Sequence, residues 1–109
     1  ATASIISQKL AIPHEKYQLK NGLTVLLATD TTTPFVAVNM TYAVGSVHEK
    51  KTPDAKTSGR AHLFEHLMFE GSAHVKNGEH FKRLEHDGAF DVNATTQFYR
   101  TNYFATVPK

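Results

Sequence analysis

Cysteine is absent from this chain of 109 residues. Its absence excludes a disulfide framework, a thiolate metal site and a cysteine nucleophile. The chain also lacks any apolar run near the ~18 residues that span a bilayer, so no membrane span is predicted. Clustered basic charge is missing too, because the lysines are dispersed and the formal net charge is only +2, with a pI near 8.9. Nucleic acid is therefore not an expected partner.

The first residues carry no targeting signal. Ala1–Ser4 have neither the basic n-region nor the apolar h-region of a signal peptide. A start in small residues is typical of a cleaved export signal, and equally of an arbitrary boundary. The localisation is left open, with the bacterial periplasm or another exported location as the preference.

The predicted elements follow the order of three strands, two helices and two strands. Asn21-Gly22 separates two alternating runs and predicts a hairpin. Ser58 is the expected N-cap of the first helix and Gly71 its end, and Asp87-Gly88 ends the second helix. Strands are expected at 17–20, 23–28, 35–44, 89–94 and 98–107, helices at 58–70 and 79–86, and a surface loop at 47–58.

Hairpins grouped apart from helices indicate the α+β class, with a mostly antiparallel sheet and helices packed on one face. We expect the five strands to share one sheet. Residues 1–109 show no internal boundary, and 1–14 read as an N-terminal arm. Because the last strand runs to Lys109 with no closing helix behind it, we expect the chain to be an N-terminal fragment of one domain.

The segment with the most chemistry is His62-Leu63-Phe64-Glu65-His66. On a helix, at about 100° per residue, Glu65 and His66 lie within about 60° of His62. Two imidazoles at i, i+4 can bind one ion, of which Zn²⁺ is the usual choice. Glu65 can then take a proton from a water at the metal. The opposite face is apolar and is expected to be buried, with Leu63, Phe64, Leu67 and Met68.

Chance remains an alternative for these five residues taken alone. The chain has seven histidines, and histidine pairs four residues apart occur on many solvated helices. The order H-x-x-E-H is nevertheless the inverzincin signature.

Further segments accompany the motif in unbroken order along the chain. They are Tyr42–Ser46, Glu49, Gly59–Phe69, Gly71-Ser72, Asp91–Thr96 and Arg100–Phe104. Together they resemble the pitrilysin/insulysin family of zinc metallopeptidases over roughly residues 15 to 109.

The resemblance implies a zinc-dependent endopeptidase that acts on peptides or unfolded polypeptides. His62 and His66 would be the zinc ligands and Glu65 the general base. Asn93 and Ala94 would lie on a sheet-edge strand that pairs with the substrate backbone. The alternative for Asn93 is a residue at a turn or strand end that holds its own backbone.

A catalytic zinc site has three protein ligands and a water. By the resemblance the third ligand is a Glu on a later helix, expected beyond Lys109. Glu70 lies about 12 Å along the helix axis from His62, too far to converge with it. A loop could recruit His74, Glu79 or His80, but these are expected to be solvated. The same expectation holds for His14, His48, Glu85, His86 and Asp87.

The alternative function is a non-catalytic peptide-binding fragment or partner subunit that lacks the third zinc ligand. The intact motif residues His62, Glu65 and His66 argue against this alternative. A third possibility is a purely structural domain whose helix carries the histidines without a chemical role. The isolated chain is expected to be inactive. Expected partners are a peptide substrate and the rest of the parent peptidase or a homologous subunit. We also expect an oligomer, because the aromatic-rich last strand leaves apolar surface and an unpaired edge.

Overall fold

The computed structural model describes residues 11–49 and 59–109. It divides into two compact units, Ala1–Thr33 and Pro34–Lys109, which are described separately. Residues 11–14 have no regular secondary structure, and the rest of the predicted N-terminal arm lies outside the described residues.

The first unit contains an antiparallel hairpin of β1 (Glu15–Gln18) and β2 (Thr24–Leu27). The amide of Leu19 donates to the carbonyl of Leu23 at 2.8 Å, and the amide of Gly22 donates back to Leu19 at 2.9 Å. Gly22 has φ of 90°, which glycine adopts without strain. The hairpin predicted from Asn21-Gly22 is thus confirmed.

The second unit contains a three-stranded antiparallel sheet. Its strands are β3 (Phe35–Tyr42), β4 (Phe90–Thr96) and β5 (Thr101–Pro108), in the order β3-β5-β4. The expectation of one five-stranded sheet was wrong, since the described strands form a two-stranded and a three-stranded sheet.

The last strand was also expected to leave an open edge, and this was wrong. β5 pairs along its length with β3, from Phe35↔Pro108 to Tyr42↔Thr101, and on its other side with β4. It is therefore the central strand. The edges of this sheet, among the described residues, are β3 and β4.

The described residues of this unit also form three helical segments: η1 (Ser46–His48), α1 (Arg60–Glu70) and α2 (Glu79–His86). Gly71 follows α1 with φ of 134°, and Gly88 follows α2 with φ of 78°, which confirms both predicted helix ends. The N-cap position of α1 is Gly59. The predicted N-cap Ser58 and most of the predicted loop lie outside the described residues.

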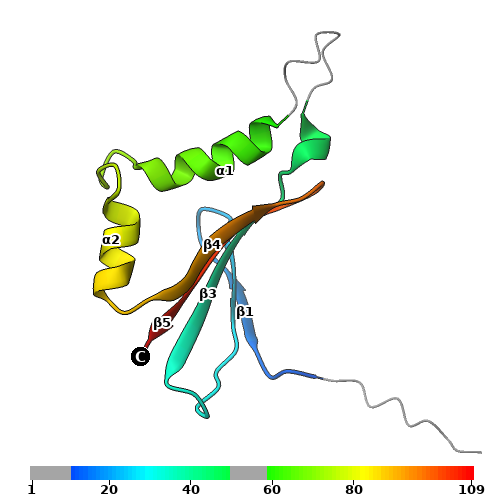
Figure 1. Ribbon diagram of the computed structural model, residues 1–109. Helices are drawn as coiled ribbons and strands as arrows, with labels where there is room; N and C mark the ends of the chain where they lie inside the picture. Colours follow the sequence, from blue (N-terminus) through cyan, green and yellow to red (C-terminus); the bar gives the residue numbers. More distant parts are fainter. Residues whose placement is uncertain (1–10, 50–58) are drawn as a thin grey trace, which may run out of the picture. The chain divides into compact units, whose positions relative to one another are not determined.

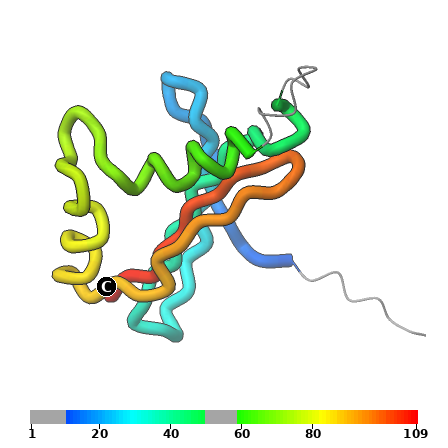
Figure 2. The backbone as a smooth tube through the Cα atoms, turned by 45° about the horizontal axis from the view of Figure 1, so that its top comes forward, coloured from blue at the N-terminus to red at the C-terminus, as the bar shows by residue number. Residues whose placement is uncertain are grey.

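Both helices lie on one side of the sheet, as predicted. α1 passes over β4 and β5, and α2 follows beside β4 (Figures 1 and 2). The ring of Phe69 on α1 stacks on Phe81 of α2 with centroids 4.9 Å apart, and it meets the edge of Tyr103 on β5 at 5.6 Å. Among the described residues no helix has the length and apolarity of a membrane span.

α1 turns the carboxylate of Glu65 toward the sheet. Glu65 is only 7% exposed, whereas Phe64 is 64% exposed. The predicted burial of the apolar face was therefore wrong, since all four of its residues are exposed: Leu63, Phe64, Leu67 and Met68. The least exposed residues of α1 are Ala61, Glu65 and Phe69, which lie one turn apart along the helix.

Candidate metal centre

The motif on α1 brings three ligand atoms together. One atom each from His62, Glu65 and His66 lies within 4.8 Å of the others, and the two Nε2 atoms are 3.0 Å apart. Two nitrogens each about 2.0–2.1 Å from a tetrahedral Zn²⁺ ion are separated by about 3.3 Å. The observed spacing is close to this value, so the two imidazoles fit one zinc ion with a small adjustment.

The carboxylate of Glu65 is held from the sheet. The hydroxyl of Thr96, at the end of β4, donates to Oε2 of Glu65. Thr96 is a residue whose role the sequence reasoning missed. A signal was present, because Thr96 lies two residues after the predicted site residue Ala94 and so projects from the same face of the strand.

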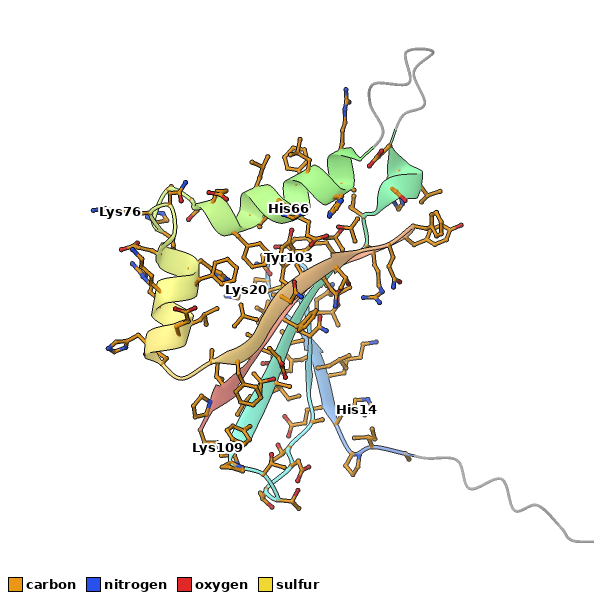
Figure 3. The ribbon with its side chains drawn as sticks, in the orientation of Figure 1. His14, Lys20, His66, Lys76, Tyr103 and Lys109 are labelled. Atoms are coloured by element: carbon orange, nitrogen blue, oxygen red, sulfur yellow. The ribbon has the colours of Figure 1, made fainter. Side chains whose placement is uncertain are left out.

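Tyr103 forms part of the surface beneath α1. Burial raises the pKa of its phenol, and the nearby Glu65 carboxylate and Tyr42 act in the same direction. Figure 3 labels His66 on α1 and Tyr103 on β5, the strand that α1 passes over. A tyrosine is already protonated at neutral pH at its ordinary pKa, so this shift leaves the phenol beside the motif uncharged.

The alternative third ligands are engaged elsewhere or remote. Glu70 accepts a hydrogen bond from the side chain of Asn77 at 2.9 Å. Glu79 accepts from the amide of Lys76 at 2.9 Å and pairs with Arg83 at 3.1 Å. His80 packs its ring against Phe69 at 5.3 Å, and His74 is exposed. In the part of the chain that the structure describes, none of these side chains joins the cluster.

The remaining predicted solvated residues are exposed. They are His14, His48, Glu85, His86 and Asp87. His48 has a structural contact in addition, because its Nδ1 accepts a hydrogen bond from the amide of Gly45 at 3.1 Å.

Asn93 and Ala94 lie on β4, an edge strand of the described sheet. Ala94 is buried, and its amide donates to Oδ1 of Asn93 at 2.8 Å. This is the contact of an Asn that holds its own backbone. A peptide that paired with Ala94 through this amide would first displace the side chain of Asn93.

A cleft of about 940 Å³ runs from the motif along the end of β4. Its walls include His62 and Glu65 on α1, Glu49 after η1, and residues 94–100 of the β4–β5 hairpin. The hairpin turn presents two aromatic rings, Phe98 and Tyr99, which are 72% and 70% exposed. The motif therefore opens on this cleft.

Comparison with known proteins identifies relatives of this arrangement. The sequence model of the family described as Insulinase (Peptidase family M16) matches residues 24–109. Zinc protease PqqE of Helicobacter pylori is 37% identical over 103 residues, which are 94% of this chain and 22% of that protein. The insulin-degrading enzyme homolog of Dictyostelium discoideum is 31% identical over 90 residues, 83% of this chain and 9% of its own length.

Solved structures show the same fold. A protease from Helicobacter pylori superposes with a TM-score of 0.79 at 36% identity, over 90% of this chain and 22% of that one. The crystal structure of pitrilysin gives a TM-score of 0.76 at 26% identity, over 93% of this chain and 10% of its own. The chain thus spans about a fifth or less of the length of these relatives.

Proposed function

This chain belongs to the insulinase family, peptidase family M16, and from that premise we propose that it supplies the water-activating part of a zinc endopeptidase active site. The observation that carries the proposal is the convergence of His62 and His66 beside the buried carboxylate of Glu65. The relatives named zinc proteases support zinc as the cofactor.

In this proposal His62 and His66 bind the ion through Nε2, because these are the two atoms that face each other at 3.0 Å. When bound, zinc polarises a carbonyl group and lowers the pKa of a water molecule to about 7. The remaining steps fall to protein side chains.

Glu65 acts as the general base. Its Oε2 atom accepts a hydrogen bond from the hydroxyl of Thr96, and this bond fixes the orientation of the carboxylate. The other oxygen, Oε1, is then the atom that takes a proton from the attacking water and later delivers it to the leaving amine. Thr96 positions this base and does not itself touch the substrate.

The substrate is an extended peptide that adds to the outer edge of β4. An edge strand has unpaired backbone groups that a peptide can satisfy, and Asn93 and Ala94 are proposed as its contact. A peptide can bind to the amide of Ala94 only after the Asn93 side chain gives up the hydrogen bond that it accepts from this amide. Removing that side chain is therefore expected to change peptide affinity.

The site needs partners beyond these residues. A third protein ligand is proposed to come from the rest of the parent peptidase or from a homologous subunit. The exposed apolar face of α1 (Leu63, Phe64, Leu67 and Met68) supports such an association, or an oligomer of this chain. Sedimentation of the chain alone and with the remainder of a relative separates these two arrangements.

The test uses a chimera in which this chain replaces the matching 103-residue segment of the Helicobacter pylori relative. We expect the chimera to cleave an internally quenched peptide, and Glu65→Gln to lower kcat by about 10²–10⁴-fold while zinc stays bound. His62→Ala and His66→Ala are expected to lose both zinc and activity.

Glu70→Gln is the matched control, because it removes the same charge from an exposed position on the same helix. If Glu65→Gln released zinc while cleavage survived, the assignment of base and ligands would be wrong. A chimera that binds peptide and zinc without cleaving would instead favour the non-catalytic alternative.

A further inference from the structure

The first turn of α1 has no capping side chain of its own. Gly59 occupies the N-cap position and has no side chain, and the first turn contains no acidic residue. Helix ends leave several amides without an intrahelical partner, and an uncapped first turn frays. His62 is the third residue of this helix, so the turn that would fray is the one that carries the first imidazole of the motif.

A carboxylate from outside the helix meets these amides. Oε2 of Glu49 accepts a hydrogen bond from the amide nitrogen of Gly59 at 2.8 Å, and Oε1 accepts one from the amide nitrogen of Ala61 at 2.9 Å. The two bonds span ten and twelve residues of sequence. Charge-assisted bonds of this length are stronger than neutral ones, and a negative charge at a helix N-terminus is favourable.

Electrostatics agrees with this geometry. The amide of Ala61 lowers the pKa of the Glu49 carboxyl most, and the amide of Gly59 adds to the effect. The carboxylate is therefore ionised when it caps the helix. Glu49 belongs to the segments that carry the family resemblance, but the catalytic proposal assigns it no role.

Glu49 is itself connected, through η1, to the turn between β4 and β5. Its amide donates to the carbonyl of Ser46 at 3.2 Å, within η1. Two η1 amides, of Ser46 and Val47, donate to the carbonyls of Gln97 and Phe98 at 3.1 and 2.9 Å. These carbonyls follow Thr96 directly in the chain.

α1 is thus connected to the β4–β5 hairpin at two points. The first connection runs through Glu49 to the amide of Ala61, and the second is the hydrogen bond from Thr96 to Glu65. His62 lies between Ala61 and Glu65 in the sequence. Loss of the first connection leaves the second in place and allows the helical turn that carries His62 to open.

We propose that Glu49 is a positioning residue of the metal centre. Its carboxylate keeps the first turn of α1 formed, so that His62 stays within reach of the ion bound by His66. The inference rests on the proposed function in one respect, the assignment of His62 as a zinc ligand. The capping of α1 by Glu49 does not depend on zinc. Glu49 touches neither metal nor substrate in this role.

The test compares Glu49→Gln with Glu85→Gln in the 109-residue chain. Glu85 is an exposed acid on α2, so its variant has the same change of charge. Hydrogen exchange is measured by NMR without metal, and Zn²⁺ affinity by competition with a chromophoric chelator. Loss of an N-cap increases opening of the first turn about fivefold, so the amides of Ala61 and His62 should exchange about fivefold faster only in Glu49→Gln.

Zn²⁺ affinity should fall by no more than the same factor, because only the formed turn is competent to bind. Glu49→Asp keeps the charge on a shorter side chain and should recover part of both effects, which a general loss of stability would not give.

Unchanged exchange at Ala61 and His62 would overturn the proposal. So would a fall in Zn²⁺ affinity larger than the increase in exchange, because Glu49 would then act on the metal by a route other than the formed turn. Uniformly faster exchange along α1, at Met68 as much as at His62, would make Glu49 a residue of the whole fold and would also overturn it. Absence of proteolysis in the chimera leaves the exchange result intact, so the two proposals fail separately.

Discussion

Helices α1 and α2 both begin after a glycine in the left-handed region, Gly59 at φ 92° and Gly78 at φ 75°. Neither N-cap makes a side-chain hydrogen bond. α2 supplies the missing charge itself, since Glu79 in its first turn accepts the amide of Lys76 and pairs with Arg83 one turn later. α1 has no acid in its first turn and receives Glu49 instead.

The difference teaches how the site is built. α2 receives its first-turn charge from its own residue Glu79, so that part of its stabilisation is local. α1 is held by contacts that come from η1 and from β4, through Glu49 and Thr96. The helix that carries the proposed metal centre is thus the one whose first turn is held from outside the helix.

The largest expected effect is that of Gly45→Ala, because the added methyl group would disrupt the packing of η1 against the β4–β5 turn. A Cβ at Gly45 would lie 2.1 Å from the carbonyl oxygen of Gln97, whereas a Cβ at Gly78 would meet nothing within 4 Å. We expect Gly45→Ala to lower the free energy of unfolding by about 3 kcal/mol. Gly78→Ala should lower it by about 1 kcal/mol, through the left-handed backbone alone.

Chemical denaturation of the two variants measures this difference. Equal losses would mean that η1 and the β4–β5 turn adjust freely, and the proposed rigid connection to α1 would be wrong.

A second prediction concerns how the stabilisation of the fold by the Glu49 carboxylate depends on pH. The pKa of Glu49 is lowered in the folded chain from an ordinary value of 4.5. Its contribution to stability is therefore complete above that value and is lost as the pH falls through the lowered pKa. The unfolding midpoints of the wild-type chain and Glu49→Gln should differ near neutral pH and converge in acid.

Thermal unfolding followed by circular dichroism, at intervals from about pH 7 to about pH 3, tests the convergence. Glu85→Gln is again the control for charge. A constant gap between wild type and Glu49→Gln down to the lowest pH would contradict the role of the ionised carboxylate.

The smallest effect is expected at the start of α2. The Glu79–Arg83 pair is partly exposed and spans one helical turn. Arg83→Met should lower the free energy of unfolding by about 0.3–0.5 kcal/mol and leave Zn²⁺ affinity unchanged. A loss of metal binding in this variant would show that α2 is coupled to the metal centre, and the difference drawn between the two helices would be wrong.

Local signals in the sequence predicted the elements well. Asn21-Gly22 predicted the hairpin, and Gly71 and Asp87-Gly88 predicted the helix ends, because turn residues act on the backbone within a few positions. The motif spacing likewise predicted that His62, Glu65 and His66 meet, since one helical turn suffices for that.

Long-range placement was not predictable in the same way. Apolar periodicity indicated that the face of α1 with Phe64 is buried, but the residue of α1 that the structure buries is Glu65, which accepts a hydrogen bond from Thr96 of β4. The central position of β5 depends on pairing across about sixty residues, which no local pattern encodes. The role of Asn93 and Ala94 stays a prediction.

In the proposed complex with a peptide, the irregularity in β4 limits the length of peptide that can pair with this edge. The pairing of β4 with β5 shifts between Phe90 and Asn93, where Asp91 takes φ of 52°. A bulge redirects the backbone donors and acceptors, so an added strand can keep register only with Asn93–Thr96, about 13 Å of chain. Contacts at this edge should therefore stop growing once a peptide exceeds about four paired residues. The same interruption shortens the stretch along which a second sheet edge could pair and aggregate.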